Sequence, residues 1–186
     1  MASDSRASMV RSAASLIGTH GVNATSFSDV LADSGAPRGS IYHHFPEGKQ
    51  QLAEDAVRWT SERVLAAQRA CPATTPRQVL DCFVGMWRRV VLASGGAAGC
   101  VVAGVAVDSD AATSAVMDLV RSTFRSWVEL LTEQFAATGV PEQRAHSLAV
   151  ATLAGMEGAL ILCRAERDVA PLDAVAEQLS LLLLPR

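Results

Sequence analysis

The stretch from Thr25 to Lys49, TSFSDVLADSGAPRGSIYHHFPEGK, constrains the fold of this chain most strongly. It contains two short segments with apolar residues at helical spacing, Phe27 to Ser34 and Arg38 to His44, separated only by Gly-Ala-Pro. A hydroxyl residue, Thr25 or Ser26, can cap the first segment, and the glycine can end it. Proline suits the first turn of the second segment, because the N–H that it lacks would have no helical partner. Two short helices joined in this way form a helix-turn-helix, whose second helix enters the major groove of DNA.

The second segment carries side chains that suit contact with a DNA duplex. Arg38 can bind a phosphate or the O6 and N7 atoms of guanine, and Gly39 allows the backbone to approach closely. Lys49 is the only lysine in the chain and opens the next helix, where its charge and the free amides can hold a phosphate. The expected DNA contacts are Thr25, Ser26, Arg38, Gly39, Ser40, Tyr42, His43, His44 and Lys49.

Apolar residues of the same stretch are expected to face inward: Phe27, Val30, Leu31, Ile41 and Phe45. One alternative is a plain helical hairpin whose second helix is simply solvated. Another is a metal site at the two adjacent histidines. Neighbouring residues point about 100° apart on a helix and no third ligand is near, so we expect no metal here.

The remainder of the chain also has helical periodicity. Only the short run from Cys100 to Val107 is a candidate strand. Further helices are expected over about Asp4 to His20, Lys49 to about Ala70, Arg77 to Ala93, about Asp110 to Thr138, Pro141 to about Arg167, and from Pro171 onward. The predicted fold is all-α with about nine helices. A three-helix DNA-binding domain over residues 1–48 precedes a helical ligand-binding and dimerisation domain over residues 49–186.

The net charge of −3 is unevenly placed along the chain. Residues 1–50 hold four basic and four acidic side chains and three of the four histidines, so the acidic excess lies in the rest. Such an N-terminal part can bind phosphates only through a few well-placed groups, and two copies would help. The start of the chain lacks a continuous apolar run, and the longest small-and-apolar stretch, Gly95 to Val107, has 13 residues. That is too short to span a bilayer, so we expect a cytoplasmic protein.

The four cysteines are widely spaced and include no CxxC pair or Cys/His cluster, so a structural zinc site is not expected. In a reducing compartment they are predicted to be free thiols that pack as small hydrophobic residues. A redox sensor at Cys100, which follows a glycine-rich segment, is the alternative.

A partner subunit is predicted from the last two helices. The run from Leu148 to Cys163 has one charge, Glu157, and is apolar on every face, so it needs cover on both sides. One side can be the protein's own core, while small residues on the other allow a second subunit to approach. A leucine stripe from Leu172 to Leu184 would complete a four-helix interface. The alternative is a fully internal core helix. The expected interface residues are Ala151, Gly155, Gly158, Leu162, Leu172, Val175, Leu179 and Leu182.

Large apolar side chains on four predicted helices are candidates for a ligand pocket, although core packing explains any one of them better than ligand binding does. Glu157 is added because a carboxylate on an apolar helix needs a partner, either a ligand or one of Arg88, Arg89 and Arg125. The candidate ligand contacts are Trp59, Phe83, Met86, Trp87, Met117, Phe124, Trp127, Met156 and Glu157.

The segment GAPRGSIYHHFPEGKQQLAEDAV resembles the signature of TetR-family repressors, in which Tyr-x-His-Phe is followed by a lysine that opens helix four. Its HHF-P-x-GK form most resembles the LmrA/YxaF-like branch of that family. The resemblance covers residues 5–58. The body is similar in helix count, length and the loop near Gly99-Cys100. The segment departs from the wider family at Leu31, where alanine is common, at Pro37, where a Ser or Thr cap is common, and by one extra residue before Lys49.

The resemblance implies a ligand-responsive repressor that binds a palindromic operator as a homodimer and is released by a small apolar or aromatic effector. It implies no cofactor. A helical dimeric adaptor without DNA binding is the alternative. An enzyme is not expected, because the chain shows no nucleophile triad in a supporting context and no paired carboxylates in a predicted cleft. Residues Gly95 to Gly99 also lack the GxGxxG spacing of a phosphate loop.

Overall fold

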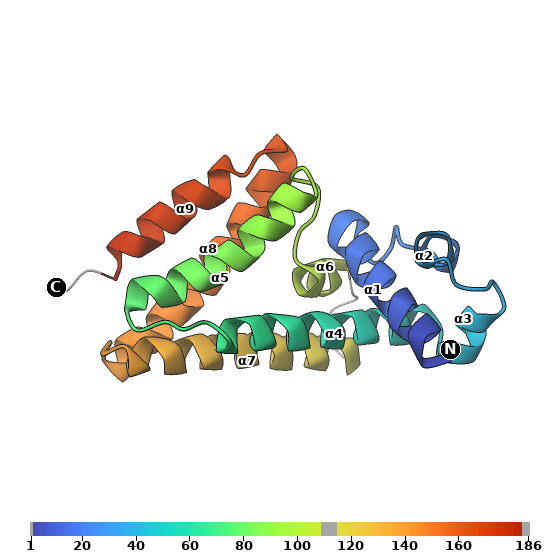
Figure 1. The fold of residues 1–186 in the computed structure, drawn as a ribbon, viewed down its shortest axis with the longest axis horizontal. Coiled ribbons are helices and arrows are strands. Elements are labelled where there is room, and N and C mark those ends of the chain that lie inside the picture. The colour runs from blue at the N-terminus through green and yellow to red at the C-terminus, as the bar shows by residue number, and fades with distance from the viewer. Residues whose placement is uncertain (1, 109–114, 184–186) are drawn as a thin grey trace. The chain divides into compact units, whose positions relative to one another are not determined.

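The computed structural model describes residues 2–108 and 115–183, and these ranges fold into α-helices without a strand (Figure 1). The all-α prediction and the expected number of about nine helices are confirmed in them. The helices are α1 (Ala2–His20), α2 (Phe27–Ser34), α3 (Ser40–His44), α4 (Lys49–Arg69), α5 (Pro76–Ala93), α6 (Val101–Asp108), α7 (Ala115–Ala137), α8 (Glu142–Glu166) and α9 (Ala170–Leu181).

One segment differs in kind from the prediction. The candidate strand forms helix α6, in which Val101, Val102 and Val105 are buried. Positions three and four apart lie near one another on a helix, so Val101 and Val102 each share a face with Val105. The predicted start of the seventh helix near Asp110 lies outside the described residues, and α7 is described from Ala115.

Local capping explains where two helices begin. The Ser26 hydroxyl accepts a hydrogen bond from the Asp29 backbone N–H, and the Asp29 carboxylate accepts one from the Ser26 N–H at 2.9 Å. The hydrogen bonds from Ser26 lower the pKa of Asp29 below its ordinary value. Thr75 and Gln78 form the same reciprocal arrangement at the start of α5. Helix α2 ends at Gly35, whose φ of 66° is left-handed and therefore favours glycine.

The chain divides into two compact units, which are described separately. The first unit comprises Met1–Glu62 and Cys100–Thr123, and the second comprises Arg63–Gly99 and Phe124–Arg186. The division falls within α4 and within α7. The functional boundary that the sequence predicts between residues 48 and 49 stays a prediction.

The second unit is built around α5, α8 and α9, which pack on one another (Figure 1). Arg88 of α5 donates two hydrogen bonds to the Asp173 carboxylate of α9, at 2.8 and 3.0 Å. This pair lowers the pKa of Asp173 and raises that of Arg88, because each charge favours the other. The sequence analysis considered Arg88 as a partner for Glu157. In the structure Arg88 pairs with the Asp173 carboxylate.

Cys71 and Cys82 form a disulfide, so the prediction that all four cysteines are free thiols is wrong for this pair. Cys71 follows the end of α4 and Cys82 lies on α5. The loop between the two helices turns the chain back, which brings the two Cα atoms to 6.2 Å. Cys100 and Cys163 form no disulfide and are buried, as predicted, and burial raises the pKa of the Cys163 thiol.

By length and composition alone, α8 is apolar enough to cross a membrane, and within the described residues it is the one helix that meets this test. The sequence analysis did not single out this helix, because it counted only uninterrupted small and apolar residues. The core helix of a soluble protein meets the same test, and 44% of the most apolar window of α8 is buried inside the protein.

Candidate nucleic-acid interface

Helices α2 and α3 both pack on α1, and the apolar residues that the sequence singled out are withdrawn from solvent. Val30, Ile41 and Phe45 have no exposed surface, and Phe27 and Leu31 are half-buried. Helix α3 begins two residues later than predicted. The turn before it is closed by a 2.9 Å hydrogen bond from the Ser40 N–H to the Pro37 carbonyl. Arg38 and Gly39 therefore lie in this turn rather than in the helix.

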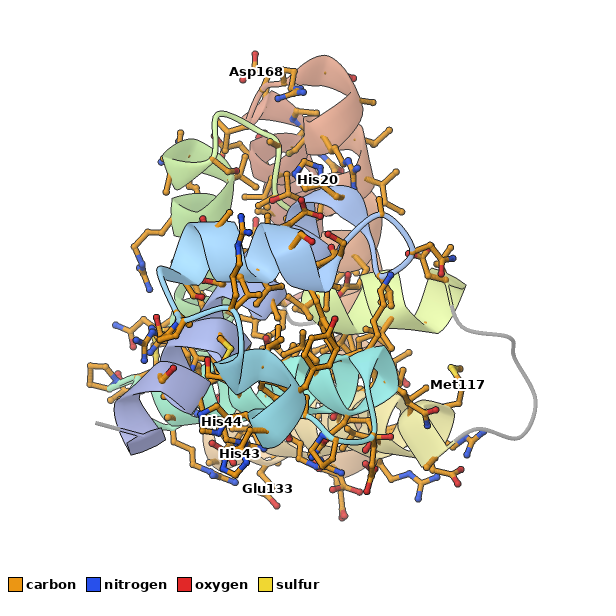
Figure 2. All side chains as sticks on the ribbon, turned by 90° about the vertical axis from the view of Figure 1, so that its right-hand side faces the viewer. His20, His43, His44, Met117, Glu133 and Asp168 are labelled. Atoms are coloured by element: carbon orange, nitrogen blue, oxygen red, sulfur yellow. A yellow bond between two sulfur atoms is a disulfide. The ribbon has the colours of Figure 1, made fainter. Side chains whose placement is uncertain are left out.

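The outward surface of this motif is polar. Arg38, Gly39 and His43 are exposed, and Tyr42 has 69% of its surface exposed. Tyr42 lies edge-on to Phe27, with 5.6 Å between ring centroids, so its ring is positioned although it is exposed. His43 and His44 occupy the last turn of α3 and are labelled in Figure 2.

Three predicted contacts use their hydroxyl groups inside the chain. Thr25 is buried, and its hydroxyl donates to the Gly21 carbonyl at 2.8 Å. Ser26 caps α2, and the Ser40 hydroxyl donates to the Pro37 carbonyl at 2.6 Å. The structure thus places Thr25 in the interior, while Ser26 and Ser40 shape the motif.

Lys49, the first residue of α4, is half-buried rather than extended into solvent. Its Nζ donates a hydrogen bond to the Asn23 carbonyl at 3.0 Å. An ammonium group has three donors, so this bond leaves donors for a phosphate while fixing the position of the charge.

The loop between α1 and α2, which contains Asn23, is also held by Asp108, the last residue of α6. The Asp108 carboxylate accepts hydrogen bonds from the N–H groups of Val22 at 2.6 Å and Asn23 at 3.3 Å. Gly21 begins this loop with a φ of 84°, and a Cβ there would lie 2.4 Å from the Asp108 Oδ2. The loop therefore connects α6 to the start of α4 through polar bonds that need glycine at this position.

Arg6 of α1 contacts two other parts of the first unit. Its guanidinium is 2.5 Å from the Asp55 carboxylate of α4 and 5.4 Å from the ring centroid of Phe45, the residue after α3. Sequence reasoning counted Arg6 only as a charge and assigned no role to Asn23 or Asp108. These partners lie 49, 26 and 86 positions away from the residues they bind, so no local pattern could reveal them.

No group of three His, Cys, Asp or Glu side chains suitable for a metal ion is found in the part of the chain that the structure describes. His43 and His44 lie 5.4 Å apart by ring centroids, with their planes at 62°.

Four of the nine candidate ligand contacts form one aromatic cluster in the second unit. Ring centroids are 6.4 Å apart for Phe83 and Trp87, 6.1 Å for Trp87 and Trp127, and 5.7 Å for Phe124 and Trp127. Met156 of α8 is buried, and the remaining candidates of this unit, Met86 and Glu157, are half-buried. Trp59 and Met117 belong to the first unit.

Helices α8 and α9 expose an apolar surface formed by large side chains. Ile161 is the most exposed, at 70%, and sequence reasoning did not include it. The residues of this α8/α9 apolar surface are Val150, Ile161, Leu162, Leu181 and Leu182.

Two predicted interface residues lie inside the second unit instead. A Cβ on Gly155 would be 3.2 Å from Val175 and 3.4 Å from Leu179 of α9 in the same chain, and Leu172 is fully buried. Gly158 is exposed with open space around its Cα, and Ala151 is half-buried. The predicted leucine stripe ends at Leu184, which lies outside the described residues.

Comparison with known proteins gives matches over nearly the whole chain. The family model "Bacterial regulatory proteins, tetR family" matches residues 10–56. The model "Transcriptional regulator LmrA/YxaF-like, C-terminal domain" matches residues 76–178. The second match covers most of the chain after the DNA-binding motif. The sequence resemblance related that part to the family only by helix count, length and one loop.

Individual relatives agree with these models. The uncharacterized HTH-type transcriptional regulator Rv0196 of Mycobacterium tuberculosis is 41% identical, over 96% of this chain and 94% of the relative. The uncharacterized HTH-type transcriptional regulator YxaF of Bacillus subtilis is 28% identical, over 97% and 95%. Among solved structures, a TetR-family transcriptional regulator from Agrobacterium tumefaciens has a TM-score of 0.84 and 26% identity, covering 99% of this chain and 100% of that one.

Proposed function

Because the chain belongs to the TetR family of DNA-binding transcriptional regulators, we propose that it is a ligand-responsive repressor. It binds a palindromic operator as a homodimer, and a small apolar or aromatic effector releases it. The family consists of transcription regulators, so the expectation that the chain is not an enzyme is confirmed. Such regulators are generally cytoplasmic, and we propose the same location here.

The observation that carries this proposal is the surface of α3 and the turn before it. Arg38, Tyr42 and His43 project from a motif anchored by fully buried Ile41 and Phe45. Arginine bound to guanine supplies direct base readout, and Tyr42 and His43 bind phosphates or base edges. Lys49, fixed by the Asn23 carbonyl, holds a phosphate at the start of α4.

The α8/α9 apolar surface supports the dimer. Leu162 and Leu182, which the sequence predicted, are exposed, as is Ile161. Exposure of an apolar surface to water is unfavourable. In a two-fold dimer the same surface of each subunit covers that of the other. A two-fold dimer presents two recognition helices to successive major-groove faces, about 34–36 Å apart.

Release by the effector requires that the effector favour one conformation. Helix α4 contributes to both units, so an effector bound in the second unit can displace the helix that begins with Lys49. The effector need only bind the released conformation more tightly, and a difference of a few kcal/mol, on the order of 100-fold in affinity, is sufficient.

The test is a fluorescence-anisotropy titration of the full chain on labelled DNA from upstream of its own gene and on random DNA, at several salt concentrations. We expect tight binding to the upstream DNA with the stoichiometry of a dimer, weaker and more salt-sensitive binding to random DNA. Equal affinity for both DNAs, on this fragment and on fragments selected from a random library, in a folded dimer would contradict the repressor and favour the adaptor.

A further inference from the structure

Two buried tryptophans of the aromatic cluster leave their indole N–H groups without partners. Trp87 and Trp127 are 4% and 1% exposed. Neither Nε1 has a hydrogen-bond partner among the described residues. The two rings come from α5 and α7, and their centroids are 6.1 Å apart. Two neighbouring N–H donors are therefore removed from water, and no described residue accepts a hydrogen bond from either of them.

Such donors are uncommon in folded proteins. The large majority of buried polar side-chain atoms are hydrogen-bonded, because a donor removed from water without an acceptor destabilises the fold. Packing alone does not call for an indole, since the neighbouring positions of the cluster are filled by Phe83 and Phe124. Two unpaired donors side by side point instead to an acceptor that arrives from outside the chain.

We propose that Trp87 and Trp127 are the hydrogen-bond donors for the effector, which is an uncharged, largely apolar molecule carrying at least one acceptor oxygen or nitrogen. The inference rests on the proposed function, because it names the effector chemistry of the second unit. The rings are close enough for one ligand to contact both, and Phe83 and Phe124 supply its apolar surroundings.

The surroundings favour an uncharged ligand. Indole N–H groups are neutral donors, and a buried charge needs a counter-charge to replace its hydration. Arg88, which follows Trp87 in the chain, is exposed and already pairs with Asp173 through two hydrogen bonds. A carbonyl or ether oxygen can accept hydrogen bonds from the indoles without the desolvation cost of a buried charge.

The experiment compares two probes with the same ring framework. 9-Fluorenone carries a carbonyl oxygen, whereas fluorene carries a methylene group at that position. Affinities are measured by calorimetry on the full chain without DNA, for the wild type, W87F, W127F and the double variant. We expect the wild type to prefer fluorenone by roughly 2- to 12-fold for each net hydrogen bond gained. Each single variant should reduce this preference, and the double variant should abolish it.

Fluorene is the internal control for folding and for apolar packing. Its affinity should stay within about 2-fold in all four proteins, since phenylalanine keeps an aromatic ring without the donor. A second readout is the indole N–H spectrum by NMR, which contains three tryptophan signals. The signals of Trp87 and Trp127, assigned with the two single variants, should move downfield with fluorenone and not with fluorene.

The proposal is overturned if neither probe binds, if the two bind equally, or if the double variant keeps the preference. Indole signals that already lie downfield and do not respond to fluorenone would assign the donors to a buried water molecule and also overturn it. The calorimetry contains no DNA, so failure of the repressor proposal in the anisotropy titration leaves this result intact, and the reverse also holds.

Discussion

The contacts that stabilise the first compact unit internally differ in kind from those within the second. The first is connected by polar bonds between elements that are far apart in sequence: Arg6 with Asp55, Asp108 with the N–H groups of residues 22 and 23, and Lys49 with Asn23. The second contains an aromatic cluster, a disulfide, hydrogen bonds between Gln68 and Gln134, and two exposed ion pairs, Arg88–Asp173 and Arg77–Asp81. Polar bonds fix positions of elements closely, which a DNA-contacting surface needs.

Buried polar atoms without a hydrogen-bond partner occur in both units, but the second unit places two such donors side by side. It keeps two unpaired indole donors and an exposed apolar surface on α8 and α9. Each of these is unfavourable in an isolated chain and becomes favourable when something binds. The comparison suggests that the second unit is completed by a partner subunit and an effector.

The largest expected effect comes from disrupting the α8/α9 apolar surface. Ile161→Glu places a charge in the proposed interface and should yield monomers, measured by analytical ultracentrifugation. Operator affinity should then fall by at least about 100-fold, because two linked half-site contacts are lost as a unit. Val107→Glu is the control, since Val107 is 83% exposed on α6 of the first unit. A dimeric Ile161→Glu protein would contradict the proposed interface.

Reduction of the Cys71–Cys82 disulfide should destabilise the second unit by roughly 3 kcal/mol, because the bond closes a short loop and limits the unfolded chain. Denaturant unfolding with and without a thiol reductant measures this change. The Cys71→Ser/Cys82→Ser variant should match the reduced protein and ignore the reductant. Identical unfolding midpoints for the oxidised and reduced wild type would show that this bond does not support the unit.

Arg38→Ala should weaken operator binding by about 1–3 kcal/mol, or roughly 5- to 160-fold, and should relax base preference at one position of each half-site. Arg77→Ala is matched in charge: Arg77 is exposed on α5 and pairs with Asp81 in the second unit. It should leave the affinity unchanged. If both substitutions weaken binding equally, Arg38 acts through net charge alone and the proposed contact is wrong.

Asp108→Ala should free the loop between α1 and α2 at a cost of about 1 kcal/mol, since two N–H groups lose their acceptor. Hydrogen exchange at the amides of Val22 and Asn23 measures the loss, and Asp81→Ala in the second unit is the control. Unchanged protection of these amides would mean that Asp108 does not hold the loop.

The smallest effect concerns Asp29, whose pKa is lowered from 3.8 chiefly by the Ser26 hydroxyl. A folded-state pKa below the unfolded value gives stability that is present above the unfolded pKa and is lost as the pH falls through the folded pKa. Ser26→Ala should raise the pKa of Asp29 toward 3.8, measured by NMR titration of its carboxyl carbon. An unchanged pKa would show that the hydroxyl is not the cause.

The sequence predicted best what local chemistry determines. Helix α2 has the predicted bounds because Ser26 and Gly35 cap it within its own neighbourhood. The buried faces of Val30, Ile41 and Phe45 follow from helical periodicity. These residues belong to the segment that carried the family resemblance, so the fold and the family followed from it.

Long-range geometry was beyond the sequence. The disulfide depends on how the loop after α4 turns, and the Asp108 bonds join positions 86 apart. Ile161 was missed because α8 is apolar on every face, so its pattern does not distinguish the buried side from the exposed one. The unpaired indoles were equally hidden, since composition does not show which donors lack acceptors.

The central claim is that two copies of α3 read one operator. Hydroxyl-radical footprinting of the full chain on its selected DNA tests this directly. We predict two symmetric protected regions with centres one helical turn, about 10–10.5 base pairs, or a multiple of it apart, and loss of both with Arg38→Ala at the same protein concentration. A single asymmetric region, or protection that Arg38→Ala leaves intact, would contradict the account.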